Sequence, residues 1–352
     1  MMMKPRYYFL LFFVVILSFA GCNSTDDGST PQNKPAQQSE AAATMQQMWE
    51  TSSLAINTAR QDAFVKIQQY ADACPMTYFK TYFKSLDASC ESKEKNDPIL
   101  TCYRMAFDRV LDGIKNETVE SGTVAIYMLY NMGYVIKTPS GCFGIDIYHR
   151  WAKKLAPYLD FLCVTHNHQD HYSEDLIQAM LDANKPVLSN YLKKGAGYDY
   201  TATVNKNYTI GKFAIRTAIT DHNTSNDGKN FVTVFRIDCG DDTDNFTLLH
   251  VGDTNFQPAQ FGNVQGAIDV LIPRYAPVPH GLDENNILGT GSGQVQPHYV
   301  LLSHILELGH DGVAYSRWPL DMALERASKL NCEKTYVPFW GEKLVWKNGE
   351  LQ

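Results

Sequence analysis

The spacing of apolar residues divides the chain into two parts. Between residues 45 and 118 they recur every three or four positions, which predicts helices with one buried face. The clearest stripe runs through Tyr103, Phe107, Val110, Leu111 and Ile114. From Gly122 onward, short apolar runs are broken by Gly, Pro and Ser, as in strands and turns. The pattern therefore predicts a helical segment followed by a strand-rich domain.

Strands and helices alternate in this second part. The expected strands are residues 124–130, 133–138, 142–147, 159–165, 213–219, 231–237, 246–251, 270–273, 299–303 and, as the last, 335–337. Helices are expected after Ser173 and from Leu320, since each segment has an apolar face. Strands interleaved with helices indicate an α/β layered domain, and about 230 residues are ample for one core.

The N-terminal residues predict a targeting segment. Lys4 and Arg6 precede an apolar run over residues 7–20, which is short for a membrane span and typical of a signal peptide. Cys22 follows Ala20-Gly21, a sequence that resembles a bacterial lipobox, in which the cysteine is lipidated and becomes the mature N-terminus. A plain secretory signal peptide is the alternative. Acyl chains on Cys22 would hold the protein at a membrane, at about 0.8 kcal/mol for each buried methylene.

Residues 23–43 contain no large apolar side chain, so they are expected to form a flexible tether. The expected division is a signal peptide at 1–21, a tether at 22–44, a helical extension at 45–120 and the strand-rich domain at 121–352. We expect the extension to pack on the outside of that domain, with a cap over the active site as the alternative. The expected location is the cell envelope, on the periplasmic or surface-exposed face of the outer membrane.

The charge of the chain limits the classes of molecule that it is expected to bind, and its cysteines permit a disulfide. The net charge is −7 for the whole chain, and −9 once the two basic residues of the leader are removed. Phosphate neutralisation needs clustered Lys and Arg, and the sequence has no basic run, so no nucleic acid is expected. The expected partners are a small-molecule substrate and the membrane. A disulfide among Cys74, Cys90 and Cys102 is permitted outside the cytoplasm, and its pairing stays open.

A cluster of side chains that can bind metal follows the expected strand at residues 159–165. His166, His168, Asp170 and His171 lie within six residues in the pattern H-x-H-x-D-H. Histidine and carboxylate are the usual ligands of zinc, iron and manganese. The motif therefore predicts a metal site at a strand end, and a polar loop that happens to be rich in histidine is the alternative.

The motif resembles that of the metallo-β-lactamase fold superfamily, a four-layer αββα sandwich of metal-dependent hydrolases. In that family an isolated His, a bridging Asp and a final His come from later strand ends. This chain offers His222, Asp253 and His304 in that order. Asp146 is similar to the family's strand-end Asp, which supports the motif loop without binding metal. The resemblance covers roughly residues 121 to 352.

The resemblance implies two divalent metal ions. The first would be held by His166, His168 and His222, the second by Asp170, His171 and His304, with Asp253 as the bridge. Zinc is expected, with manganese or iron as alternatives, because the ligands are all nitrogen and oxygen. Two ions about 3.5–4 Å apart would hold a bridging hydroxide as nucleophile, which Asp170 would orient. His310 is expected to line the pocket as a proton donor; a surface loop position is the alternative.

The expected activity is hydrolysis of an ester, lactone or phosphodiester. His171 and the bridging Asp253 count against a true β-lactamase, which usually lacks that Asp. Phe339 stands where the lactonase and phospholipase D-like branches have a His, so their substrates are not carried over. Arg274 is a candidate contact for an anionic substrate group, or a surface charge. The alternatives are an iron-dependent redox enzyme on the same fold and a non-catalytic surface-binding lipoprotein.

Overall fold

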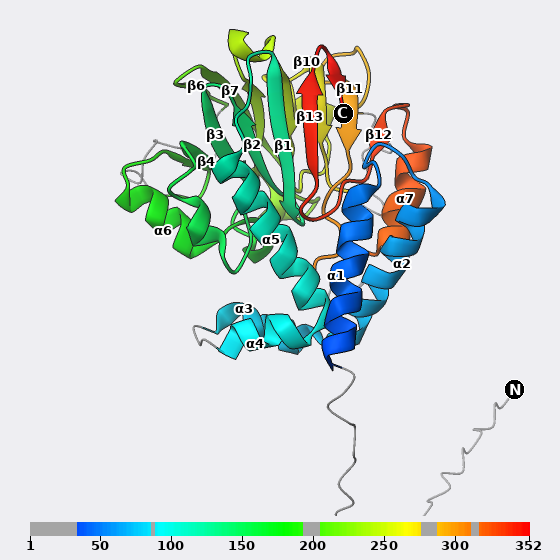
Figure 1. Cartoon of the computed structure of the whole chain (residues 1–352). Coiled ribbons are helices and arrows are strands. Elements are labelled where there is room, and N and C mark those ends of the chain that lie inside the picture. The colour runs from blue at the N-terminus through cyan, green and yellow to red at the C-terminus, as the bar shows by residue number, and fades with distance from the viewer. Residues whose placement is uncertain (1–33, 86–88, 193–204, 276–286, 311–316) are drawn as a thin grey trace, which may run out of the picture.

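The computed structural model describes residues 34–85, 89–192, 205–275, 287–310 and 317–352. The expected signal peptide, Cys22 and the first part of the expected tether lie outside these residues. The described chain forms two mixed seven-stranded sheets with helices around them (Figure 1). The expected α/β sandwich with N-terminal helices is confirmed. None of the described helices is long and apolar enough to cross a membrane.

The first sheet has the strand order β14-β13-β1-β2-β3-β4-β5. Its strands are β1 Thr123–Tyr130, β2 Gly133–Thr138, β3 Gly141–Ile145, β4 Phe161–Val164, β5 Val187–Ser189, β13 Lys343–Lys347 and β14 Glu350–Leu351. Strand β2 is antiparallel to both β1 and β3, whereas β3, β4 and β5 are parallel to one another. The carboxyl ends of β1, β3, β4 and β5 therefore lie at one edge of the sheet.

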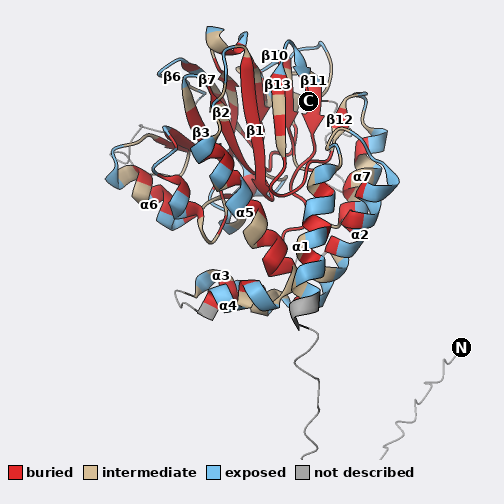
Figure 2. Cartoon of the chain, in the orientation of Figure 1, coloured by how far each residue is buried: buried red, intermediate tan, exposed pale blue. Residues whose placement is uncertain are grey.

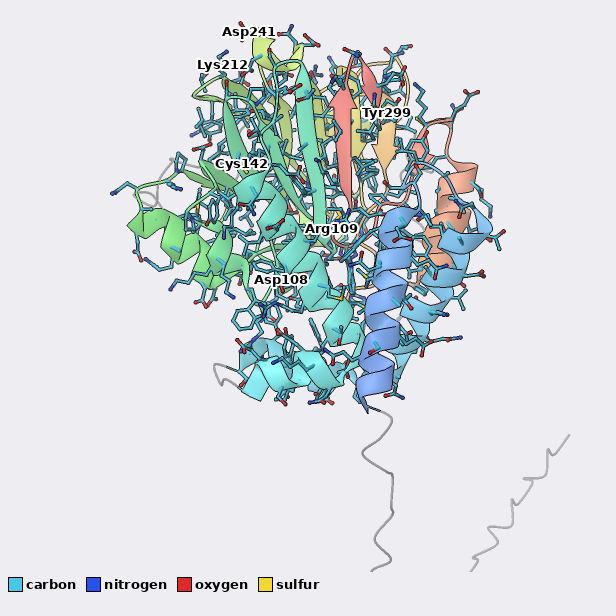
Figure 3. The ribbon with its side chains drawn as sticks, in the orientation of Figure 1. Asp108, Arg109, Cys142, Lys212, Asp241 and Tyr299 are labelled. Atoms are coloured by element: carbon cyan, nitrogen blue, oxygen red, sulfur yellow. The ribbon has the colours of Figure 1, made fainter. Side chains whose placement is uncertain are left out.

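The second sheet has the order β12-β11-β10-β9-β8-β7-β6. Its strands are β6 Asn207–Ile210, β7 Phe213–Thr220, β8 Val232–Asp238, β9 Thr247–His250, β10 Gly266–Ile272, β11 Val295–Leu301 and β12 Thr335–Tyr336. Strand β8 is antiparallel to β7 and β9, and β9 to β12 are parallel, so β7, β9, β10 and β11 also end at one edge. At the opposite ends of these strands, Lys212 and Asp241 form an exposed ion pair of 3.0 Å (Figure 3).

The core lies between the sheets and under the helices that cover them. All eight residues of β1 are buried, which is why its sequence is a continuous apolar run and not an alternating one. Helix α5 (Pro98–Asn116) packs on β1, and α6 (Glu174–Asp182) packs on β4 and β5. Figure 2 shows the buried residues concentrated in the strands and on the inner faces of the helices.

The helical extension begins earlier than expected. Its other helices are α1 Lys34–Glu50, α2 Thr58–Ala73, α3 Met76–Lys84 and α4 Ser89–Asn96. Helix α1 starts inside the expected tether and packs on α2 and α5, with Ala41 fully buried. Alanine is the strongest helix former, and its small side chain permits close packing without a large apolar residue. The described cysteines, Cys74, Cys90 and Cys102 included, are free thiols.

A buried ion pair joins this extension to the sandwich. Arg60 of α2 is 1% exposed, and its guanidinium lies 2.5 and 2.8 Å from the two carboxylate oxygens of Glu342. Arg60 also donates to the carbonyl of Val337 at 2.8 Å, and Glu342 accepts from the backbone N–H of Phe339 at 2.7 Å. The helices and the segment before β13 therefore share one buried polar network.

Four strands were not expected from the sequence, and 335–337 is not the last strand. Strands β13 and β14 follow it, while β5 and β6 lie at the outer edges of their sheets. Strand β6 alternates between exposed and half-buried residues, and β13 has lysines at both ends, so neither carries a continuous apolar run. Helix α7 (Leu320–Lys329) lies where expected.

Candidate metal centre

The carboxyl ends of strands from both sheets supply the centre. The H-x-H-x-D-H loop follows β4, and later ligands follow β7, β9 and β11. The structure brings all of the predicted ligands together in two groups: His166, His168, His222 and Asp253, and Asp170, His171 and His304. Within each group the ligand atoms lie within 4.8 Å of one another. Residues far apart in the sequence thus meet because their strands end at the same place.

Asp253 lies between the two groups. Its Oδ2 is 3.5 Å from Nε2 of His222 and 3.4 Å from Nε2 of His304. Its Oδ1 is 3.5 Å from Nε2 of His171. In the second group, Oδ2 of Asp170 is 3.1 Å from His171 Nε2 and 3.2 Å from His304 Nε2. One carboxylate therefore contacts imidazoles of both groups, as a bridging ligand would.

The donor atoms of this cluster fit divalent metal ions. Nε2 of His166, His171 and His222 and Oδ1 of Asp253 are buried without a hydrogen-bond partner. Each such atom costs about 1–3 kcal/mol when it stays unpaired. Four of them in one place therefore indicate a bound ligand, and the nitrogen and oxygen donors suit zinc, manganese or iron.

Electrostatics favour the metal-binding forms of His166 and Asp253, whereas burial is outweighed at His171 and His304 by neighbouring carboxylates, which raise the pKa of both imidazoles. Burial, and then the neighbouring His171, lowers the pKa of His166 well below its ordinary value. Burial opposes ionisation of Asp253, but His304 and His171 outweigh it and hold the pKa of that carboxyl well below its ordinary value. Neutral imidazole and ionised carboxylate are the forms that bind metal.

Asp146 orients the motif loop, as the resemblance implies. Its carboxylate accepts hydrogen bonds from the backbone N–H and the hydroxyl of Thr165, both at 2.7 Å, and contacts Nδ1 of His171 at 2.8 Å. With Nδ1 donating to this carboxylate, Nε2 of His171 is left to bind an ion. Asp146 has a φ of 48°, a left-handed conformation that costs about 1–3 kcal/mol and is held by these contacts.

Gly252 allows the two sheets to approach at the centre. Its φ is 51°, and a Cβ there would lie 2.6 Å from the hydroxyl oxygen of Thr165. Only glycine therefore lets the end of β9 pass this close to the end of β4. The backbone N–H of Thr233, on β8, also donates to the carbonyl of Thr165 at 2.8 Å.

Asn131 is a positioning residue that sequence reasoning missed. Its side-chain amide donates to Oδ2 of Asp170 at 3.0 Å, and its backbone carbonyl accepts from the backbone N–H of His304 at 3.1 Å. It therefore holds two ligands of the second group. Asn131 stands in the turn between β1 and β2 with a φ of 55°, where asparagine is an ordinary turn residue, so no local signal marks its role.

His310 lies beside the centre and is not one of its ligands. Its Nδ1 is 3.1 Å from a carboxylate oxygen of Glu307, and its ring packs on Trp318, which also packs against His304. Burial, and then the charge of Asp170, raises the pKa of Glu307. Sequence reasoning missed Glu307. Arg274 is held against the carbonyl of Thr254 at 3.3 Å, one residue from Asp253.

A cavity of about 470 Å³ opens beside Asp170. Its walls come from α3, the segment after β3, the motif loop, the first turn of α6 and Glu307. The helical extension therefore packs on the sandwich, as expected, and also supplies one wall of the cavity next to the metal ligands. Helices α1, α2 and α5 are packing elements, whereas α3 lies beside the candidate site, where a cap was the alternative expectation.

Comparison with protein families gives a match to the family described as Beta-lactamase superfamily domain over residues 126–304. That range covers about half of the chain and contains all of the candidate ligands. A UPF0173 protein of Pyrococcus abyssi is 26% identical over 144 residues, which are 40% of this chain and 64% of that protein. The chain thus spans less than two thirds of the length of this curated relative.

Solved structures with a similar chain path include YhfI, a metallo-beta-lactamase fold protein from Bacillus subtilis. It is 18% identical, with a TM-score of 0.45, over 63% of this chain and 98% of that one. Igni18, a metallo hydrolase from the archaeon Ignicoccus hospitalis, is 17% identical, with a TM-score of 0.45 over 64% and 99%. CmlA, a diiron beta-hydroxylase from Streptomyces venezuelae, is 13% identical, with a TM-score of 0.43 over 66% and 55%.

Proposed function

Because the chain belongs to the β-lactamase superfamily, we propose that it is a dinuclear metal-dependent hydrolase of an ester, a lactone or a phosphodiester. The observation that carries this proposal is the position of Asp253, which contacts imidazoles of both ligand groups. A shared carboxylate supports two neighbouring ions. We propose zinc for both, and the nitrogen and oxygen ligands also suit manganese or iron.

Ions held at these ligands would lower the pKa of water and polarise the bond that is cleaved. We propose that residues of the chain orient the attacking water and protonate the leaving group. Oδ2 of Asp170, fixed by the Asn131 amide at 3.0 Å, is placed to accept a hydrogen bond from the attacking water and so to orient it. His310, whose Nδ1 contacts Glu307, would donate a proton to the leaving oxygen.

Two other functions use the same residues differently. The all nitrogen and oxygen ligand set also suits iron, so an iron-dependent redox enzyme is the alternative. A non-catalytic binding lipoprotein would have no use for seven converging residues, four of which have buried, unpaired donor atoms.

The test combines metal content with a hydrolase panel. Natively purified protein should contain two ions per chain and should hydrolyse at least one ester, lactone or phosphodiester, but no β-lactam. Asp253→Asn should lose metal and activity, whereas Asp241→Asn, an exposed carboxylate at the opposite ends of the strands, should lose neither. Iron with a visible absorption band and no hydrolysis would favour the redox enzyme. Bound metal with neither reaction would favour the binding protein.

We also propose that Cys22 is lipidated and holds the enzyme on a membrane of the cell envelope, at the periplasmic or surface-exposed face. The basic residues Lys4 and Arg6, the apolar run after them and Ala20-Gly21 before the cysteine support this anchor. The proposed partners are this membrane and a small-molecule substrate. The acidic charge of the chain supports the exclusion of nucleic acid.

A further inference from the structure

The cavity beside Asp170 has a basic wall. Four basic side chains line it: Lys80, Lys84, Arg150 and Lys153. The first two belong to α3, and the others to the segment that follows β3. The extension and the sandwich therefore both contribute cations to the lining of a single space.

Two of the four acidic residues of the lining have partners of their own. Asp170 belongs to the second ligand group, and Glu307 lies 3.1 Å from Nδ1 of His310. Glu174 and Asp175 stand in the first turn of α6, where carboxylates interact favourably with the unpaired N–H groups at the helix start. The lining therefore carries both signs of charge, but none of these carboxylates forms an ion pair with Lys84 or Lys153.

Two of the lysines have no carboxylate partner among the residues that the structure describes. Some lysines elsewhere on the described surface form ion pairs, as Lys212 does with Asp241 and Lys334 does with Glu350. Neither Lys84 nor Lys153 forms one with any residue that the structure describes. An unpaired ammonium group at a cavity is a ready partner for an anion.

Arg150 holds the basic wall in place. Its guanidinium donates to the backbone carbonyls of Tyr82 and Phe83, in the last turn of α3, and lies over the ring of Tyr82 at 5.1 Å. These contacts dock the end of α3, and with it Lys84, against the segment after β3. Arg150 is therefore a positioning residue.

The same cavity offers an apolar surface. The rings of Phe83 and Tyr148 are stacked, with centroids 4.2 Å apart, and both residues line the cavity. The volume of about 470 Å³ is within the range of small-molecule sites. An apolar wall next to unpaired cations fits a small molecule that has a hydrophobic part and a negative charge.

We propose that Lys84 and Lys153 bind an anionic group, a phosphate or a carboxylate, on the substrate of the hydrolase, and that α3 thereby sets substrate specificity. The inference rests on the proposed function, because it takes the cavity as the substrate site. It goes beyond that function by naming the charge of the substrate and assigning recognition to the extension.

The test is binding of phenylphosphonate to the zinc-loaded protein, measured by isothermal titration calorimetry. Partly exposed charges contribute modestly, so Lys84→Gln or Lys153→Gln alone should weaken binding by about two- to fivefold, and the double variant by about tenfold. Lys84→Arg, which keeps the charge, should bind nearly as well as wild type. The matched control is Lys347→Gln, an exposed lysine of β13 outside the cavity, which should change nothing.

The neutral dimethyl ester of the same phosphonate should bind much more weakly to wild type and should not distinguish the variants. Unchanged affinity of the double variant for phenylphosphonate, with folding checked by circular dichroism, would overturn the inference. So would an absence of phenylphosphonate binding to wild type. If the double variant weakens binding but wild type hydrolyses nothing, the hydrolase proposal fails and the anion site stands. Hydrolysis with an unchanged KM for charged substrates in the double variant would reject the anion site alone.

Discussion

The buried pair of Arg60 and Glu342 predicts that Arg60→Met will destabilise the whole protein and not the N-terminal helices alone. Arg60 is 1% exposed and makes hydrogen bonds to both oxygens of Glu342 and to the carbonyl of Val337. Methionine fills similar space but donates nothing. The substitution therefore leaves a buried carboxylate whose remaining hydrogen-bond donor among the described residues is the backbone N–H of Phe339.

The magnitude follows from that unpaired carboxylate. Removing one member of a buried ion pair costs about 3–5 kcal/mol, because the other charge stays without compensation. Apolar contacts of the methionine offset a small part, so we expect a loss of about 3 kcal/mol in the free energy of unfolding. That is a large share of the roughly 5–15 kcal/mol typical of a folded protein. At about 2 °C for each kcal/mol, the melting temperature should fall by about 6 °C.

Urea unfolding followed by circular dichroism and by tryptophan fluorescence measures this loss. The matched control is Lys66→Met on the same helix, whose ion pair with Glu40 is 3.8 Å long and exposed, and which should cost less than about 0.5 kcal/mol. Adding Glu342→Gln to Arg60→Met should recover part of the loss, because the buried group is then neutral. A loss below 1 kcal/mol, or a separate early transition of the helices, would refute this account of the network.

Removing metal with EDTA should lower the melting temperature, since an ion at 100 times its Kd stabilises the folded state by about 2.7 kcal/mol; a calorimetric trace that neither EDTA nor added zinc changes would exclude the centre. Asp170→Asn should abolish most hydrolysis in a folded protein, and full activity would remove Asp170 from the mechanism. His310→Ala should give a partial loss of kcat, of about 10²–10⁴-fold, because only proton donation is lost; an unchanged kcat would remove His310 from the mechanism. Cys22→Ser should lose the radioactive fatty-acid label that marks wild type, and equal labelling of both would refute lipidation.

Buried strands could be predicted from the sequence, whereas an exposed edge strand could not. Strand β1, buried on both faces, appears in the sequence as an apolar run, and β1, β2 and β7, all of them mostly buried, lie within one residue of their expected bounds. Strand β6, half exposed at the edge of its sheet, has no such run. It is a strand because β7 offers it hydrogen-bond partners, which local sequence does not reveal.

Some residues of the candidate site could likewise be predicted from the sequence, and others could not. The convergence of the seven candidate ligands could be predicted because metal binding restricts the residue types and the family pattern orders them along the chain. Asn131 and Glu307 could not, because an asparagine in a turn and a glutamate in a loop are ordinary until the fold places them beside Asp170. The wall that α3 gives to the cavity was equally hidden, since its lysines read as surface charges.

The place of β13 beside β1 has a consequence for how the protein is made. The partners in this ladder, such as Thr123 and Lys347, are roughly 220 residues apart in sequence, and pairings this distant form slowly. Until residues 343–347 have left the ribosome, β1 is an eight-residue apolar strand with one edge open. Such an edge is a template for aggregation during this interval. The first sheet is begun early in synthesis and closed only near the end of the known sequence.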